Sequence, residues 1–181
     1  MNWYNVSIGQ GQEIVKLLTA DLDRLDKEIY LCSVIFKKPI EYFETMPREQ
    51  LLKWINKTGF TAEYPDPKLA LPFRYGLTFY RFKTQARQLS KQEFVALQAF
   101  ADKGVIDNLH SILAILSTPY RFWQRRKNDF EKTAELFRQE MSFGLAYGYA
   151  VFFSAYYPTL LEIGLQYLNG VRKAASELTR S

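Results

Sequence analysis

The stretch FGLAYGYAVFFSAYYPTLLEIGLQYL, residues 143–168, carries a single charge, on Glu162. It overlaps an uncharged run of 21 residues between Glu140 and Glu162, which is long enough to cross a bilayer. Its second half is amphipathic, however, because polar side chains recur on one helical face at steps of three and four residues. Its first half holds four tyrosines, and tyrosine favours the membrane interface over the bilayer centre. We therefore predict a core helix that other helices surround, and no membrane span.

This helix has more aromatic side chains than one helical layer can cover, since they occupy much of its circumference. Exposed aromatic clusters are typical of protein interfaces. The basic stretch PYRFWQRRKND, residues 119–129, is expected to be a loop that adds positive charge to such an interface. We therefore expect the partner-binding residues to be Tyr149, Phe152, Phe153, Tyr156, Tyr157, Arg121, Trp123, Arg125, Arg126 and Lys127.

The helical spacing of apolar residues dominates the rest of the chain. The prolines at 39 and 47 are each expected to begin a short helix, because the first helical turn tolerates proline. Ser90 and Glu93 have the spacing of a capping box and start another helix, followed by helices near 109–116 and from about residue 128. A further helix is predicted near residues 21–36, with one buried stripe formed by Leu22, Leu25, Ile29, Cys32 and Phe36.

A proline-rich segment interrupts the helices. After its last proline, Pro72, apolar residues alternate with Arg74, Gly76 and Thr78 from Phe73 to Phe79, which is the period of a strand. We therefore predict a mostly α protein, a single domain of about six to eight helices with a small β-hairpin near residues 72–83. Its parts are an N-terminal helical part (1–59), a proline-rich loop and hairpin (60–89), and a C-terminal helical part (90–181).

The sequence offers no constellation for catalysis. His110 is the only histidine and Cys32 the only cysteine, and both lie among apolar residues, so we interpret them as structural. The two glycines of SIGQGQ, residues 7–12, have no Lys-Ser/Thr after them, so a turn before the first helix is favoured over a phosphate loop. We expect no enzyme activity, no metal and no cofactor.

Positive charge is concentrated in the middle of the chain. The net charge is +5, and residues 67–92 contain six basic side chains and no acidic one, with aromatic residues among them. This composition is found where strands bind single-stranded nucleic acid. The favoured interpretation is a hairpin whose aromatic residues face the helices. The alternative is a nucleic-acid-binding module that uses Arg74, Arg81, Lys83 and Arg87.

Several short blocks resemble a known group of proteins. They include VSIGQGQEIVKLL, LDRLDKEIYLCSVIF, LPFRYGLTFYRF and NDFEKTAELFRQEMSFGLAYGYAVFFSAYY, and together they span about residues 6–157. This order resembles small helical proteins from the tail-gene clusters of bacteriophages of Bacteroidota, described as tail assembly chaperone-like. The resemblance implies a non-catalytic protein that keeps the tape measure protein soluble during tail assembly. The stretch 121–127 is more basic than that group leads us to expect.

The expected partner is an elongated helical client or a neighbouring phage subunit, with homo-oligomers left open. A virion structural subunit of the connector or adaptor type is an alternative, and nucleic acid is the less favoured partner. The N-terminus shows no secretory signal pattern, and a single cysteine excludes an internal disulfide. These observations favour an intracellular protein, and the resemblance implies the cytoplasm of an infected bacterial host, or the virion.

Overall fold

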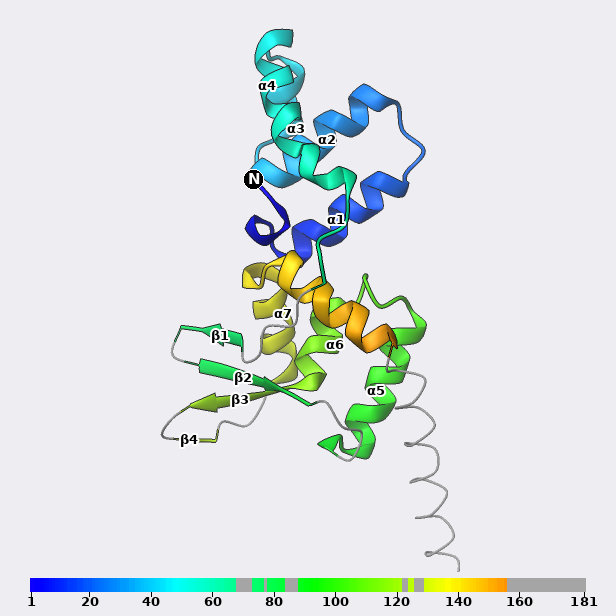
Figure 1. Cartoon of the computed structure of the whole chain (residues 1–181), viewed down its shortest axis with the longest axis vertical. Helices are drawn as coiled ribbons and strands as arrows, with labels where there is room; N and C mark the ends of the chain where they lie inside the picture. Colours follow the sequence, from blue (N-terminus) through cyan, green and yellow to red (C-terminus); the bar gives the residue numbers. More distant parts are fainter. Residues whose placement is uncertain (68–72, 77, 84–87, 122–123, 126–128, 156–181) are drawn as a thin grey trace, which may run out of the picture.

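Helices make up most of the protein. The computed structural model describes residues 1–67, 73–76, 78–83, 88–121, 124–125 and 129–155. Within them, a four-stranded antiparallel sheet in the order β1-β2-β3-β4 accompanies the helices, and residues 143–155 are helical (Figure 1). The elements are η1 (Trp3–Asn5), α1 (Ile8–Thr19), α2 (Arg24–Phe36), α3 (Ile40–Glu44), α4 (Arg48–Thr58), η2 (Gly59–Ala62), β1 (Phe73–Tyr75), β2 (Thr78–Phe82), α5 (Lys91–Asp102), α6 (Leu109–Leu116), β3 (Ser117–Arg121), β4 (Gln124–Arg125) and α7 (Phe130–Glu140).

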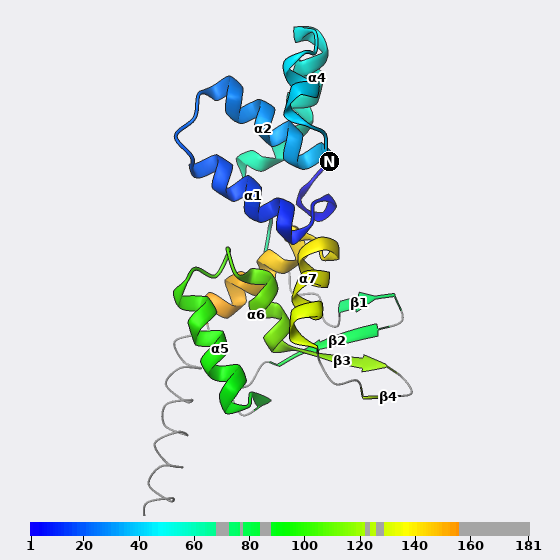
Figure 2. The same cartoon turned by 180° about the vertical axis from the view of Figure 1, so that it is seen from behind.

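The elements fall into two groups along the long axis of the molecule. Helices α2, α3 and α4 form one end, and the sheet with α5, α6 and α7 forms the other (Figures 1 and 2). Helix α1 lies between them and packs on both α2 and α7. Helices α6 and α7 lie between the sheet and α5 in both views. The predicted mostly α fold with a small β element is therefore confirmed.

The helical segment 143–155 belongs to the core, as predicted. Phe143, Ala146, Tyr149, Ala150 and Phe153 are each at most 5% exposed and recur at steps of three, three, one and three residues. The hydroxyl of Ser142 accepts a hydrogen bond from the N–H of Leu145 and so caps the start of this segment. Among the described residues, no helix has the length and apolar character needed to span a membrane. The second half of the stretch, 156–168, lies outside the described residues.

Helix α1 is fastened to the start of that segment. The N–H of Ile8 donates to the carbonyl of Met141, and the N–H of Phe143 donates to the carbonyl of Val6. A Cβ added at Gly11 would overlap the ring of Phe143, which is fully buried against the backbone of α1. The expected turn at SIGQGQ is therefore wrong, because both glycines lie inside α1 and Ser7 is its N-cap in a capping box with Gln10.

The N-terminal helices have a small core of their own. Ile29, Cys32, Phe43 and Leu51 are buried together between α2, α3 and α4, and the two short helices after Pro39 and Pro47 form as predicted. The predicted stripe of α2 is wrong at its start. Leu22 precedes the helix and is 39% exposed, and Leu25 is 56% exposed, because the packing against α3 and α4 begins only at Ile29.

The sheet is larger than the predicted hairpin. Strands β1 and β2 form that hairpin, with a positive φ at Gly76 in its turn. Strand β3 then pairs with β2, and β4 pairs with β3, so the loop expected at 119–129 is wrong over both strands. Pro119 lies within β3, where it is the cross-strand partner of Tyr80 in β2. The capping box of Ser90 and Glu93 at α5 is confirmed.

We expect Gly11→Ala to lower the free energy of unfolding by about 2 kcal/mol, although alanine is the better helix former, because the new Cβ overlaps the Phe143 ring. Gly59→Ala is the matched control, since a Cβ there meets nothing within 4 Å and the backbone is right-handed. The control should be neutral or stabilising by up to about 1 kcal/mol. Urea unfolding followed by circular dichroism measures both, and equal stability of the two variants would contradict the packing described here.

Candidate partner-binding surfaces

The histidine and the cysteine are structural. The side-chain amide of Gln12 lies 3.2 Å from Nδ1 of His110 and also donates to the carbonyls of Ile106 and Asp107. Burial lowers the pKa of His110, and the charge of Arg138 lowers it further. Among the described residues, no group of three His, Cys, Asp or Glu side chains is placed to hold a metal ion.

The thiol of Cys32 is not poised for reaction. Its side chain is fully buried between α2, α3 and α4. Burial raises its pKa to about 11, and the nearby charge of Glu28 adds to the effect. A nucleophilic cysteine needs the opposite, a lowered pKa and access for a substrate.

Two of the aromatic residues expected to bind a partner are instead part of the core. Tyr149 packs on Phe82 at 4.3 Å between ring centroids, and its pKa rises to about 12 because it is buried. Phe153 is 3% exposed and packs with Leu97 and α6. The expectation of an exposed aromatic face is wrong for these two residues, because α5, α6 and β2 cover that side of the helix. Phe152 is half-buried.

The structure describes only some of the other residues that the sequence predicts to bind a partner. Arg121 is the last residue of β3 and Arg125 belongs to β4. Tyr156, Tyr157, Trp123, Arg126 and Lys127 lie outside the described residues.

One face of the sheet is packed and the other is open. On the packed face, the rings of Phe73 and Tyr80 lie 5.5 and 4.9 Å from the ring of Phe137 in α7. The opposite face carries exposed side chains, which we call the outer sheet face: Arg74, Phe79, Arg81, Thr118 and Tyr120.

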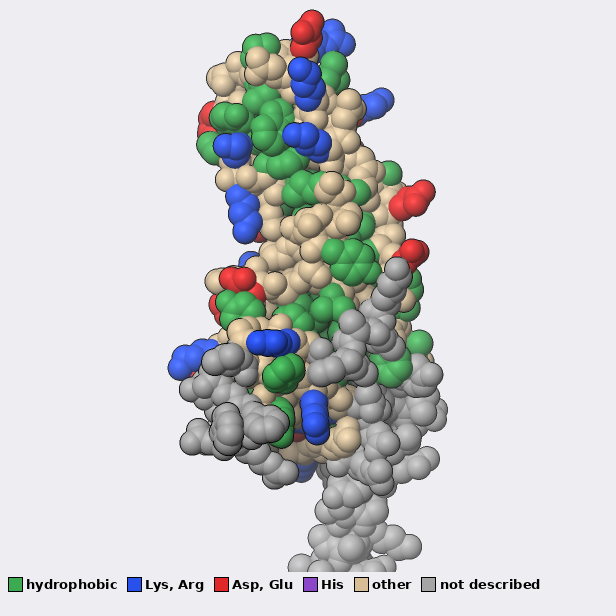
Figure 3. Space-filling view, turned by 60° about the vertical axis from the view of Figure 1, so that its left-hand side comes forward, with side chains coloured by type: hydrophobic (Ala, Val, Ile, Leu, Met, Phe, Trp, Pro, Cys, Tyr) green, Lys and Arg blue, Asp and Glu red, His purple; other side chains and the backbone are tan. Residues whose placement is uncertain are grey.

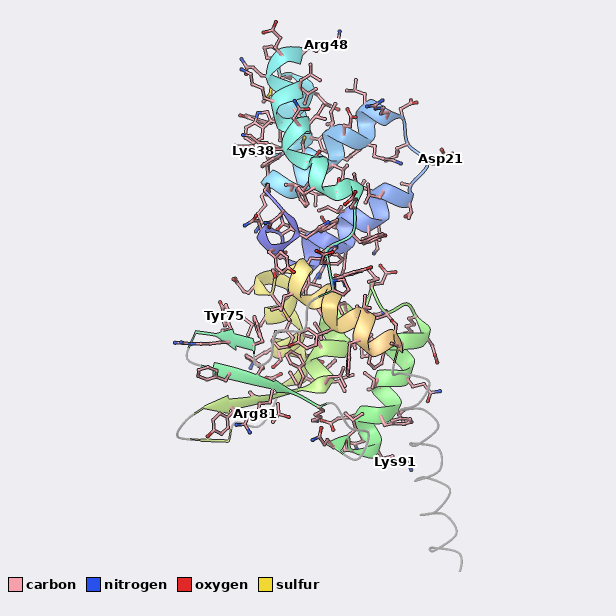
Figure 4. All side chains as sticks on the ribbon, viewed as in Figure 1. Asp21, Lys38, Arg48, Tyr75, Arg81 and Lys91 are labelled. Carbon is pink, nitrogen blue, oxygen red and sulfur yellow. The ribbon has the colours of Figure 1, made fainter. Side chains whose placement is uncertain are left out.

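Arginine and aromatic side chains pair on the outer sheet face. The guanidinium of Arg74 lies 5.4 Å from the ring centroid of Phe79, and that of Arg81 lies 4.9 Å from that of Tyr120. Arg81 lies beside β3 in Figure 4. Phe79 is 37% exposed and Tyr120 is 39% exposed, so both rings remain accessible beside their cations. This face combines planar groups with positive charge.

A second cluster of lysines and aromatic rings lies on the N-terminal helices, and we call it the N-terminal aromatic surface. It consists of exposed Tyr42 and Lys57 and of half-buried Lys38 and Trp54. Lys38 lies over the ring of Tyr42 at 4.5 Å, and Lys57 lies over the ring of Trp54 at 4.7 Å. Tyr42 is 41% exposed and Trp54 is half-buried. In the upper half of Figure 3, hydrophobic side chains are bordered by Lys and Arg side chains. Sequence reasoning missed this surface, although Trp54 and Lys57 have the helical spacing of a side-chain pair.

The four basic residues of the nucleic-acid alternative have different surroundings. Arg74 and Arg81 belong to the outer sheet face. The ammonium of Lys83 lies 2.6 Å from a carboxylate oxygen of Glu93, and its side chain is 16% exposed, so it ties β2 to α5. This bond helps to lower the pKa of Glu93, against the burial that raises it. Arg87 lies outside the described residues.

Comparison with protein-family models, curated proteins and solved structures found no significant match to this chain.

We expect Cys32 to resist thiol reagents in the native protein. At pH 8 a thiol with a pKa of about 11 is almost entirely protonated, and its burial also excludes the reagent. Reaction with Ellman's reagent should be slow in native buffer and complete in guanidinium chloride. Rapid labelling of the native protein would contradict the buried position between α2, α3 and α4.

Proposed function

We propose that this chain is a non-catalytic bacteriophage assembly protein that binds a protein client, as a tail assembly chaperone binds the tape measure protein. The sequence blocks that resemble such proteins support the proposal. So does the N-terminal aromatic surface, in which a lysine lies over exposed Tyr42 and another over half-buried Trp54. Assembly of this kind takes place in the cytoplasm of the infected host.

The base of this surface is well fixed. The ring of Trp54 packs edge-on against Phe36 at 4.6 Å and against Phe43 at 5.9 Å, while Tyr42 packs on Phe43 at 5.2 Å. Phe43 is fully buried, so the exposed rings stand on the small core of α2, α3 and α4. Rings held in place lose little conformational freedom on binding, which is why rigid aromatic residues often dominate binding energy.

The surface suits an amphipathic helical client. Such a helix presents apolar side chains at steps of three and four residues, which would pack on Tyr42 and Trp54. Carboxylates beside those apolar side chains would approach Lys38 and Lys57, whose ammonium groups already lie over the two rings. The observation that carries the proposal is the pairing of exposed Tyr42 and of half-buried Trp54 each with its own lysine.

We expect Tyr42→Ser to weaken binding of the tape measure protein of the source phage about 10-fold or more, because it removes an exposed aromatic contact. Val95→Ser on α5 is the matched control, since Val95 is 54% exposed and lies outside this surface. Titration calorimetry with the purified client measures both variants, and circular-dichroism melts check that each is folded. Unchanged affinity in Tyr42→Ser would exclude this surface as the client site.

Quantitative mass spectrometry of purified particles beside the lysate separates the two assembly roles. Abundance in the lysate with absence from particles is expected for a chaperone. A fixed copy number in the particle would instead identify a structural subunit with a permanent interface.

A further inference from the structure

We propose that the outer sheet face binds single-stranded nucleic acid, a function separate from client binding. The register of the sheet carries the inference. Arg74 pairs with Phe79, Phe79 pairs with Tyr120, and Tyr120 pairs with Arg125, so these four residues form one row across all four strands. The hairpin predicted from the sequence contains only half of this row, and β3 and β4 complete it.

The two exposed rings are neighbours in this row. Phe79 and Tyr120 are direct cross-strand partners in β2 and β3. Adjacent strands lie about 4.8 Å apart, so two consecutive unstacked bases can rest on the two rings. Arg74 and Arg81 lie over the same rings, at 5.4 and 4.9 Å from the centroids. A base can therefore stack on the guanidinium plane itself, or take its place on the ring while the guanidinium moves to a phosphate.

All the charged side chains of the four strands are positive. The strands contain Arg74, Arg81, Arg121 and Arg125 and no aspartate or glutamate. Neither Arg74 nor Arg81 forms an ion pair with a carboxylate of the described residues. Arg74 is oriented by its Nε, which donates to the carbonyl of Gly76 at 2.8 Å. Guanidinium groups without an acidic partner favour phosphate, which they can bind through two N–H groups at once.

The combination of exposed aromatic rings with guanidinium groups on the outer sheet face favours a nucleic acid over other anions. An acidic peptide supplies carboxylates but no planar group to cover Phe79 and Tyr120, whereas every base has an aromatic face. A duplex keeps its bases stacked inside, so it can offer only its phosphates to this surface. Among the described elements, α7 and the helical segment 143–155 pack on the opposite side of the sheet, and Phe79 and Tyr120 are 37% and 39% exposed. In the lower half of Figure 3, basic and hydrophobic side chains lie next to one another.

Fluorescence anisotropy with the full chain tests the inference, using fluorescein-labelled oligothymidylate and oligouridylate of about 12 nucleotides. We expect saturable binding that weakens between about 50 and 200 mM salt. Phe79→Leu and Tyr120→Leu keep an apolar side chain but remove the ring, and each should weaken binding about 10-fold. Tyr120→Phe keeps the ring and should bind as the parent does. Arg74→Gln and Arg81→Gln should weaken binding and make the salt dependence shallower.

Arg48→Gln is the charge-matched control, because Arg48 lies at the opposite end of the molecule in Figure 4 and should not affect binding. The same labelled probe as a duplex and a labelled polyglutamate peptide complete the set. Tighter binding of either single strand than of both competitors, with the expected ring variants, supports the proposal, and the preferred sugar identifies RNA or DNA. No saturable binding, equal binding of polyglutamate, or unchanged binding by Phe79→Leu and Tyr120→Leu would overturn it.

Tyr42→Ser separates this inference from the proposed function. It should weaken client binding and leave oligonucleotide binding unchanged, while Tyr120→Leu should do the reverse. If one surface proves not to bind its proposed partner, the proposal for the other surface can still be tested on its own.

Discussion

The packing of Phe143 on the backbone of α1 is the contact on which the rest of the structure depends. A ring of this size fits there only because residue 11 has no side chain. The hydrogen bonds between Val6 and Phe143 and between Ile8 and Met141 hold the two segments in register around it. Through this contact the N-terminal helices join the segment 143–155, which in turn contacts β2 and α6. Both exposed surfaces are thereby carried on one connected core.

The two surfaces use the same chemistry on different supports. Each places a cation over an exposed ring, with Lys over Tyr and Trp on the helices and Arg over Phe and Tyr on the sheet. A lysine ammonium is a compact charge, whereas an arginine guanidinium is planar and stacks while it donates hydrogen bonds. This difference is the reason for assigning a protein client to the helices and a nucleic acid to the sheet.

The sequence is most informative where the local signal and the packing agree. The capping box at Ser90 and the prolines before α3 and α4 fix helix starts within a few residues, so these elements are predictable. The predicted buried stripe of α2 is wrong at Leu25, because the spacing of apolar residues does not reveal where the neighbouring helices begin to cover α2. Strand β3 is missed because a proline argues locally against a strand, whereas the pairing that forms β3 joins it to β2, far away in the sequence. For the same reason the sequence cannot tell buried Tyr149 from exposed Tyr120, since both lie in aromatic-rich stretches.

The joining of Val6 and Ile8 to residues 141 and 143 also determines the order in which the chain can fold on the ribosome. The core of α2, α3 and α4 is built from residues close in sequence, so it can form as soon as those helices leave the exit tunnel. The packing of α1 cannot be completed so early, because Phe143, whose ring packs on Gly11, is synthesised much later than α1. Until then the part of α1 around Gly11 is exposed to water and to other chains, although α2 can already pack on the helix. The newly made protein is therefore most prone to aggregation just before residue 143 emerges.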